Sequence, residues 1–430
     1  MVATDTATNV AQHAGQHLGR PLRVAVAGLG GRGATYAELI ATRHEGVAEV
    51  VQIAEPRQFH RRRAGAALGL GADAVFADWR DLVEGERIAD AVIIATQDHD
   101  HRPAIDAFAT AGYDILCEKP VAATEHDCAA AVAAAEAAGV FLGVCHVLRY
   151  TPNTRRILSL VADGAIGDIV AVQHLEPVGW FHFAHSFVRG AWRREDESGP
   201  LLLTKSCHDL DWLSYVVGAP ASRVSSFGSL SVFTPANKPA LASDRCITCA
   251  VEADCPYSAV AMYRAGLVPD SDESYFTRVM APVYTSEAVD EALRTGPYGR
   301  CVYDCDNDAV DHQVVNIEYA NGVTASFTLS AFTRFEDRRT SIFGTRGQIT
   351  TDGRTVELYD FVRRSSTLFD VTGDGSGHGG GDAAMLAAFV DALHAGELGR
   401  FTSHGDETLA THRIVFAAER ARRTGTVVAL

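Results

Sequence analysis

Three lysines and one glycine-rich turn are the residues of this chain whose types and spacing first indicate chemistry. The run Gly28-Leu29-Gly30-Gly31-Arg32-Gly33 follows the apolar segment 22–27 and fits the pattern G-x-G-x-x-G. Such glycines form a tight turn, let the backbone approach a pyrophosphate and allow a helix to pack closely on a strand. Lysines are scarce: of the 38 Lys and Arg residues, only Lys119, Lys205 and Lys238 are lysines. We therefore expect that an ammonium group is needed where lysine is kept.

An acidic residue follows the next apolar segment at the distance that a dinucleotide site requires. The segment 48–54 ends at Glu55, which lies 22 residues after Gly33 (55 − 33). A carboxylate at that offset binds the ribose 2′-hydroxyl of NAD and repels a 2′-phosphate. Arg32 and Arg57 are close enough in sequence to weaken that repulsion. The prediction is NAD, with NADP as the alternative, and the two flanking strands disfavour an ordinary glycine turn without a nucleotide.

The first third of the chain alternates predicted strands with predicted helices. Apolar runs at 89–96, 113–117 and 140–144 are typical of buried strands. This alternation predicts a Rossmann domain, a doubly wound parallel sheet over residues 21–147. Ligands of such sheets bind beyond the carboxyl ends of the strands. Several candidate residues lie at those ends: Gly28, Gly30, Gly31, Arg32, Gly33, Glu55, Thr96 and Lys119.

Residues 148–430 predict a second domain of the α+β class, for substrate binding and oligomerisation. Its sheet is expected to be open and largely antiparallel, with strands at 168–173, 314–319, 323–329, 340–343 and 347–351. Asn321-Gly322 is typical of a hairpin turn. Residues 234–304, rich in Pro, Cys and polar side chains, predict an insertion that lacks a core of its own. Residues 1–20 are predicted to be a disordered tail.

Further short motifs extend along both predicted domains. They are Ala95-Thr96 followed by His101, Ala111-Gly112, Glu118-Lys119-Pro120, Arg149-Tyr150 and Gly164-Ala165-Ile166-Gly167-Asp168. Together with the glycine turn they resemble the Gfo/Idh/MocA family of nicotinamide-dependent oxidoreductases, over about residues 22–230 and 310–425. The resemblance implies a Rossmann domain and an α/β domain whose open sheet lines the substrate cleft. It also implies cofactor contacts from Thr96, His101 and Glu118, and a homodimer or homotetramer.

Hydride transfer from a secondary alcohol requires a side chain that accepts the hydroxyl proton. Lys119, which the resemblance puts near the nicotinamide, can donate a hydrogen bond to the substrate oxygen. The family also has a histidine in an Asp-x-x-x-His pattern, where His208 matches the histidine and Thr204 replaces the aspartate. We predict that His208 is the acid–base group and that Lys119 and Lys205 polarise the reacting oxygen. A helix-surface cation is the alternative for Lys205.

Aromatic and basic side chains crowd residues 180–193. Rings can stack on a sugar face while histidine and arginine hold hydroxyl groups, so this segment predicts a polyol pocket. A hydrophobic lid without ligand contacts is the alternative. His378, in a glycine-rich loop, is a further candidate. The residues predicted to bind substrate are Arg149, His182, His185, Arg189, Trp192 and Asp209.

These features together predict an enzyme, an NAD(P)-dependent dehydrogenase that acts on a secondary alcohol of a sugar, glycoside or cyclitol. One alternative is a glycoside-cleaving relative in which the same hydride chemistry is transient and NAD is recycled. Another is a nucleotide-sensing protein without catalysis, which the presence of Lys119 and His208 disfavours.

Five of the nine cysteines lie within residues 246–305. Cys246 and Cys249 form C-x-x-C, Cys255 follows, and Cys301 or Cys305 could complete four soft ligands. That set predicts a structural zinc site, with Cys301 as the fourth ligand. A disulfide, free thiols or a redox pair are the alternatives.

The overall charge and hydropathy exclude several classes of partner. The net charge is −16 and there is no basic stripe, so nucleic acid and anionic membranes are not expected partners. No apolar run of about 18 residues is present, as a membrane span would require. The first 20 residues lack the apolar core of a signal peptide, and we expect a cytoplasmic enzyme.

Overall fold

The computed structural model describes residues 19–269, 271, 273–281, 283–334, 337–375 and 377–430. The chain folds into two compact units that are not contiguous in sequence. The first unit contains the chain up to residue 169 together with 207–220 and 343–416, and the second contains 170–206, 221–342 and 417–430. Most of the predicted tail, residues 1–18, lies outside the described residues. The domain boundary between 147 and 148 stays a prediction.

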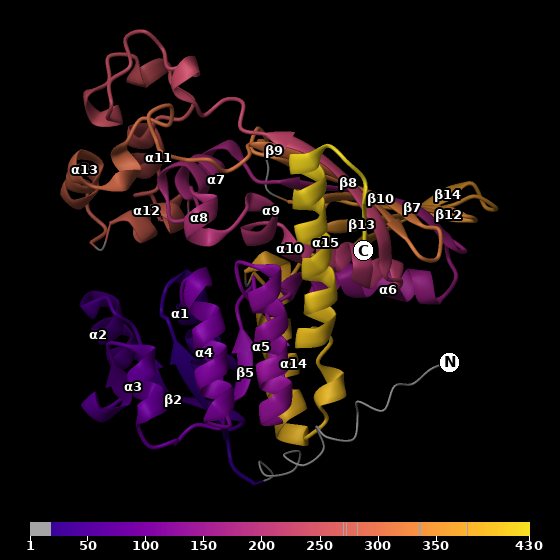
Figure 1. The fold of residues 1–430 in the computed structure, drawn as a ribbon, viewed down its shortest axis with the longest axis horizontal. Coiled ribbons are helices and arrows are strands. Elements are labelled where there is room, and N and C mark those ends of the chain that lie inside the picture. The colour runs from indigo at the N-terminus through magenta and orange to yellow at the C-terminus, as the bar shows by residue number, and fades with distance from the viewer. Residues whose placement is uncertain (1–18, 270, 272, 282, 335–336, 376) are drawn as a thin grey trace. The chain divides into compact units, whose positions relative to one another are not determined.

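The first unit contains a six-stranded sheet in the order β3-β2-β1-β4-β5-β6. Figure 1 labels β2 and β5 of this sheet. All neighbouring strands run parallel. The strands are β1 (Leu22–Ala27), β2 (Ala48–Ala54), β3 (Val75–Phe76), β4 (Ala91–Ile94), β5 (Asp114–Cys117) and β6 (Leu142–Val144). The order steps outward from β1 in both directions, so the predicted doubly wound sheet is confirmed.

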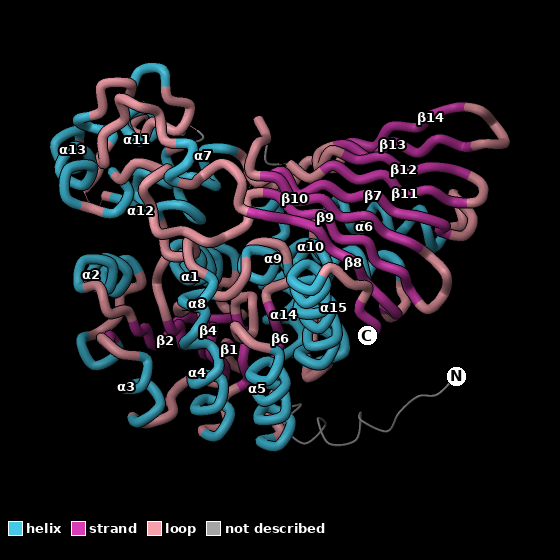
Figure 2. Tube along the Cα trace, turned by 45° about the horizontal axis from the view of Figure 1, so that its top comes forward, coloured by secondary structure: helices cyan, strands magenta, loops and turns pink. Residues whose placement is uncertain are grey.

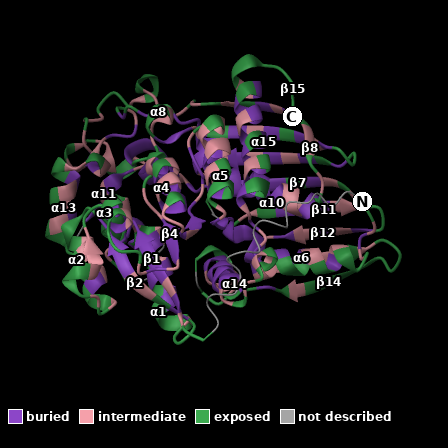
Figure 3. Ribbon diagram, turned by 60° about the horizontal axis from the view of Figure 1, so that its bottom comes forward, coloured by how far each residue is buried: buried purple, intermediate pink, exposed green. Residues whose placement is uncertain are grey.

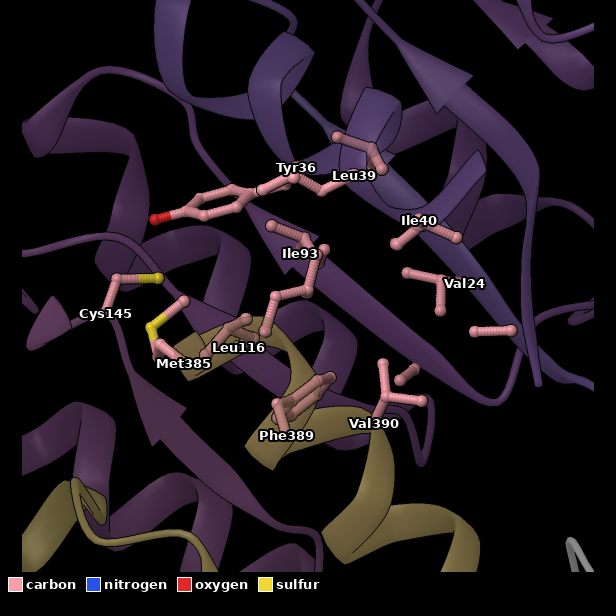
Figure 4. Packing of buried hydrophobic residues seen from close by; sticks show 14 of the residues in the cluster. Val24, Tyr36, Leu39, Ile40, Ile93, Leu116, Cys145, Met385, Phe389 and Val390 are labelled. Carbon is pink, nitrogen blue, oxygen red and sulfur yellow. The ribbon is translucent and has the colours of Figure 1, made fainter. Parts of the chain in front are cut away.

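Both faces of this sheet are buried, which explains why its strands are continuous apolar runs (Figure 3). Alternate residues of β1 enter different cores: Val24 and Val26 pack in one, Ala25 and Ala27 in the other. The first core also holds side chains of α14 (Gly381–Ala395). Figure 4 shows Met385, Phe389 and Val390 of that helix beside Leu116, Ile93 and Val24.

Helices connect the parallel strands. They are α1 (Gly31–Arg43), α2 (Gln58–Ala67), α3 (Trp79–Glu84), α4 (Asp98–Thr110) and α5 (Glu125–Ala138). Local signals set the ends of α5: the Thr124 hydroxyl accepts a hydrogen bond from the backbone N–H of Asp127, and Gly139 takes the left-handed conformation that ends the helix.

A second sheet has nine strands in the order β14-β13-β12-β11-β7-β10-β9-β8-β15 (Figure 2). β7 and β10 pair in parallel, whereas β9 and β10 form the predicted antiparallel hairpin around Gly322, which has a positive φ of 85°. The predicted open, mostly antiparallel sheet is therefore confirmed. Its strands are β7 (Ile169–Pro177), β8 (Ala221–Ser229), β9 (His312–Tyr319), β10 (Thr324–Ser330), β11 (Arg339–Gly344), β12 (Gly347–Thr351), β13 (Thr355–Asp360), β14 (Ser365–Asp370) and β15 (Val428–Ala429).

The cysteine-rich insertion has a small hydrophobic core, which corrects the expectation that it lacks one. Its helices are α11 (Ala259–Ala265), α12 (Ser274–Met280) and α13 (Ser286–Thr295). Tyr263, Phe276 and Leu293 from these helices pack together and against Phe181. The core forms because apolar residues recur on one face of short helices that the composition alone obscures.

Six further α-helices lie in the rest of the described chain and carry or flank candidate site residues. They are α6 (Pro152–Ala162), α7 (Trp180–Phe183), α8 (Glu195–Ser198), α9 (Leu201–Thr204), α10 (Cys207–Val217) and the long C-terminal α15 (Gly405–Thr424). Within the described ranges, no helix combines the length and apolar character needed to cross a bilayer.

Candidate active site

The glycine turn has the three properties that a dinucleotide site needs. Gly28 has a φ of 90°, and a Cβ there would lie 2.4 Å from the carbonyl oxygen of Ala95. A Cβ on Gly33 would lie 1.9 Å from the carbonyl oxygen of Gly28, so α1 can pack this closely only with glycine. A Cβ on Gly30 would meet no atom nearer than Arg57 Nη2 at 3.8 Å, its chain neighbours aside, so the backbone there is open to a phosphate. No side chain caps α1, so its first N–H groups can bind an anion.

Glu55 at the end of β2 is tied to this turn. One carboxylate oxygen accepts the N–H of Leu29 at 2.8 Å, and the other accepts Arg57 Nε at 2.6 Å. Burial opposes ionisation of Glu55, but the hydrogen bonds from Arg57 and Leu29 outweigh it and lower the pKa of the carboxyl. A charged acceptor therefore stands beside the turn, where the ribose of a dinucleotide is expected.

Two polar atoms near the ends of β4 and β5 are buried without a hydrogen-bond partner among the described residues. They are the Thr96 hydroxyl and Nε2 of His101. His101 Nδ1 lies 2.7 Å from the carbonyl oxygen of Pro120, so Nδ1 donates the hydrogen bond and Nε2 is left as an acceptor. Buried polar atoms are almost always bonded, and a bound cofactor would satisfy these two. The residues present fit a dinucleotide.

The Arg32 side chain forms hydrogen bonds with two carboxylates of the protein. Its guanidinium donates to both oxygens of Asp382 at 2.6 and 2.7 Å and to Glu118 at 2.8 Å. Glu118 also accepts the Tyr36 hydroxyl at 2.7 Å and the N–H of Lys119 at 3.1 Å. Burial opposes ionisation of Glu118, yet the Arg32 charge outweighs it and lowers the pKa of the carboxyl. The cofactor contacts predicted for Arg32 and Glu118 stay predictions, since both are engaged within the protein.

Lys119 follows β5 and lies in the first unit together with His208. Burial lowers the pKa of His146 to about 4, and the Lys119 charge adds to that shift. Burial raises the pKa of Cys207, and the same ammonium opposes that shift. The ammonium is thus close enough to act on the residue that directly precedes His208.

His208 has a carboxylate partner although Thr204 replaces the family's aspartate. On α10, Nε2 of His208 lies 3.2 Å from Oδ2 of Asp209, and both side chains are at most 3% exposed. Asp209 is therefore placed to hold the His208 ring. Across from it, the ring of His378 lies 6.1 Å away between centroids, at an interplanar angle of 81°.

Arg149, a predicted substrate residue, is part of a buried charge network. It donates to both oxygens of Asp211 at 2.7 Å and to Glu407 at 2.7 Å, and it also bonds the carbonyl of Thr402. Only 3% of its side chain is exposed. The Arg149 guanidinium is committed to this network, and its predicted contact with substrate stays a prediction.

In the second unit, Lys205 forms an ion pair with the buried Glu176. Its ammonium lies 3.2 Å from Glu176 Oε1, while Arg338 binds the other oxygen at 2.8 Å. A buried carboxylate between two cations is a common structural arrangement. The catalytic role predicted for Lys205 stays a prediction.

The aromatic segment of the second unit packs on the insertion. His185 lies 2.9 Å from the Tyr263 hydroxyl and stacks on Tyr298, and burial lowers its pKa to about 3. Arg189 is 1% exposed and donates to the carbonyls of Arg300 and Tyr257. These two side chains therefore support the insertion, and their predicted substrate contacts stay predictions.

His182 and Trp192 lie nearer the surface of the same unit. The His182 ring is 5.0 Å from Phe276, and Trp192 is 37% exposed with its ring 6.3 Å from Phe187. Their geometry is compatible with ring stacking on a ligand, which is what the sequence predicted for them.

All nine cysteines are free thiols. A cavity of about 20 Å³ is lined by four of them: Cys246, Cys249, Cys255 and Cys301. Nevertheless, no group of three or more His, Cys, Asp or Glu side chains in the described ranges is arranged to hold a metal ion, so the zinc prediction is not supported. Burial raises the pKa of the Cys255 and Cys301 thiols.

Sequence reasoning missed Asp382, which binds both Arg32 and His378. His378 Nδ1 lies 3.0 Å from Asp382 Oδ1. His378 precedes α14 with a positive φ of 52°, so helical spacing does not predict this contact. The other partner of Asp382, Arg32, is 350 residues away in sequence, and no local pattern connects the two.

The chain is similar to several known proteins. Putative oxidoreductase YteT of Bacillus subtilis is 26% identical over 315 residues, covering 69% of this chain and 71% of YteT. Inositol 2-dehydrogenase 1 of Saccharopolyspora erythraea is 36% identical over 153 residues, covering 35% of this chain and 44% of that enzyme. A solved structure of levoglucosan dehydrogenase with NADH and levoglucosan has a TM-score of 0.67 at 19% identity, covering 95% of this chain and 99% of that one. At that identity the likeness shows the fold alone.

Two family profiles match nearly the whole chain. The profile described as "Oxidoreductase family, NAD-binding Rossmann fold" matches residues 22–146, and that of the family's C-terminal alpha/beta domain matches residues 159–430. The glycine turn and the parallel sheet lie within the first match. The chain therefore belongs to the Gfo/Idh/MocA family of oxidoreductases, whose N-terminal domain is an NAD-binding Rossmann fold.

Proposed function

We propose that this protein is an NAD(P)-dependent dehydrogenase that oxidises a secondary alcohol of a sugar, glycoside or cyclitol. The observation that carries the proposal is the content of the first unit. It holds an open glycine turn after β1, Lys119 just beyond β5 of the same sheet, and a His208 ring paired with Asp209. These are the parts that hydride transfer from an alcohol needs in the protein.

The chain's own residues would handle the proton and the developing charge. The nicotinamide, when bound, supplies the hydride acceptor. His208 accepts the hydroxyl proton, and Asp209 stabilises the imidazolium that forms. Lys119 donates a hydrogen bond to the substrate oxygen, where negative charge grows as the proton leaves. The Thr96 hydroxyl and His101 Nε2 are the buried groups that would bind the cofactor.

The sugar or cyclitol class is supported by relatives. An inositol 2-dehydrogenase is 36% identical over its matched segment, and a levoglucosan dehydrogenase shares the fold. The aromatic side chains of His182 and Trp192 suit a polyol, because rings can cover the apolar face of a sugar.

NAD is the proposed coenzyme, with NADP as the less favoured one. Glu55 is charged and adjacent to the turn, so a 2′-phosphate would meet a carboxylate. Arg32, the cation within the turn, is already held by Asp382 and Glu118. Arg57 is the remaining nearby cation, and its guanidinium pairs with Glu55.

The proposal is tested by incubating the enzyme with NAD or NADP and myo-inositol, levoglucosan, free hexoses and methyl glycosides. We expect absorbance of NADH to rise with at least one polyol. Sugar release from a glycoside without net NADH would identify the coenzyme-recycling alternative instead. No turnover of any kind together with tight NADH binding would favour a nucleotide-sensing protein.

The coenzyme assignment has its own test. In Glu55→Ala, the KM for NAD is expected to rise about tenfold or more, because the ribose loses its acceptor, while the KM for NADP rises less or falls. Arg57→Ala is the matched control that removes only the partner of Glu55. Equal changes in the KM values for NAD and NADP would show that Glu55 does not contact the ribose.

A further inference from the structure

Two histidine–aspartate pairs lie next to each other in the first unit. His208 is paired with Asp209 at 3.2 Å, and His378 is paired with Asp382 at 3.0 Å. The two rings are 6.1 Å apart between centroids and nearly perpendicular. They come from the first turn of α10 and from the loop before α14, so the two segments meet although 170 residues of chain separate them (378 − 208).

The two rings differ in their access to solvent. Only 3% of the His208 side chain is exposed, whereas 31% of the His378 side chain is exposed. A proton on His208 is therefore shielded from solvent, whereas the neighbouring His378 ring reaches water. A gap between rings of this size can be crossed through one water molecule.

The loop holds His378 in an unusual conformation. Its φ of 52° is positive, and among the described residues other than glycine only Arg364 shares that property. Gly379 and Gly380, which follow it, also have positive φ values of 63° and 92°. Side chains rarely adopt this region, and residues held in it cluster at functional sites. In this conformation His378 Nδ1 lies 3.0 Å from Asp382 Oδ1.

Asp382 is itself rigidly placed. Its carboxylate is fully buried and accepts two hydrogen bonds from Arg32. Burial opposes its ionisation, but Arg32 and His378 outweigh that effect, so the pKa of Asp382 lies below its usual range. The carboxylate stays charged at neutral pH and can hold a His378 ring that gains and loses a proton.

We propose that His378 is a proton-relay residue: it takes the proton of the oxidised alcohol from His208 and releases it to solvent. This inference rests on the proposed dehydrogenase function. In each turnover the C–H bond gives its hydride to the coenzyme, and the O–H proton passes to His208, then to His378, then to bulk water. No other reactant is needed. In the reduction direction the same path delivers a proton to the forming alcohol.

Several charged groups face the relay and set its protonation. Asp382 on α14 and Asp209 on α10 favour the charged rings. Arg32 lies behind Asp382, and the Lys119 ammonium acts on the neighbouring Cys207. Asp374, paired with Arg43, lies on the same loop near Gly380. Two carboxylates contact the rings directly, and two cations lie near those carboxylates or near the residue before His208.

The relay is tested with His378→Gln, using the polyol that the wild-type enzyme oxidises fastest. We expect kcat to fall about tenfold or more, while KM and the NADH dissociation constant change less than twofold. The residual rate should rise with the concentration of imidazole or another small buffer, because free buffer replaces the missing ring. The wild-type rate should not depend on buffer.

His126→Gln is the matched control, since this ring on α5 is 90% exposed. It should keep wild-type kinetics. A His378→Gln enzyme whose rate is lost without any response to buffer, or whose KM alone changes, would make His378 a structural or binding residue and overturn the relay.

A second test does not depend on turnover. NMR titration of histidines gives the pKa of His378, whose resonance is assigned by its loss in His378→Gln. If the two rings exchange protons within one coupled pair, His208→Gln should shift the pKa of His378 upward by about 0.3 unit or more, because the positive neighbour is gone. No shift would overturn the coupling even if the dehydrogenase activity is found. A shift without any polyol oxidation would uphold the coupling and refute the proposed function.

Discussion

Two pairs of histidines in the same unit have opposite environments. His208 and His378 each contact an aspartate, and His378 reaches solvent. His146 and His412, whose rings are 5.8 Å apart, are fully buried. Burial lowers the pKa of His146 to about 4 and that of His412 to about 3.

The difference shows what turns a histidine into an acid–base group. The ring of His412 accepts the N–H of Val121 at 3.3 Å, so it supports the turn after Lys119 in its neutral form. The His208–His378 pair differs because each ring has a carboxylate oxygen within 3.2 Å, against 3.7 Å from His146 to Asp211, and because the His378 side chain is 31% exposed. The same residue type thus supports structure in one place and is suited to proton transfer in the other.

The largest expected effect is on catalysis by the first pair. His208→Gln should lower kcat by about 10²–10⁴-fold, because the hydroxyl proton loses its acceptor. His412→Gln keeps an acceptor for the N–H of Val121, and its kcat should fall by less than about fivefold. Steady-state rates of the two variants provide the measurement. A similar fall of kcat in both variants would contradict the proposed difference between the two histidine pairs.

The next effect separates two aspartates that lie two residues apart on α10. Asp211→Asn leaves the Arg149 guanidinium buried with only Glu407 as a charged partner, so the free energy of unfolding should fall by about 3 kcal/mol. Asp209→Asn should mainly lower kcat, because the His208 ring loses its orienting partner. Urea unfolding and kinetics of both variants test this. A larger stability loss in Asp209→Asn would contradict the assignment.

The smallest effect is a pH dependence of stability. His146 and His412 have depressed pKa values in the folded state, so below about pH 6.5 the unfolded chain binds protons that the folded chain excludes. The free energy of unfolding should therefore fall on acidification, by up to about 1.4 kcal/mol per pH unit and ring. Unfolding curves at pH 7 and pH 5.5 measure it.

In His412→Gln, the free energy of unfolding should fall less steeply on acidification than in the wild-type chain, because the contribution of the His412 ring is gone. His126→Gln, a change of an exposed ring, should leave the slope unchanged. If the free energy of unfolding depends on pH equally in the wild-type chain and in His412→Gln, the folded chain does not exclude a proton from His412.

Much of the fold was predictable because its signals are local. The glycine turn, the apolar strands of the parallel sheet and the hairpin at Gly322 follow from the residue pattern of short segments. The insertion core was not predictable, since its helices are short and its residues from three separate helices meet only in the folded chain. The cysteines illustrate the same limit: their spacing suggested zinc, but no group of three or more metal-ligating side chains is arranged around a metal position in the part of the chain that the structure describes.

The sequence by itself determined the dinucleotide turn, the acid at Glu55 and the position of Lys119 at a strand end, because each depends on residues close together in the chain. Only the tertiary structure decided that Asp382 binds Arg32 and that His378 lies beside the His208 ring. Contacts between distant segments depend on how helices and sheets pack, and no local periodicity encodes which side chains then meet.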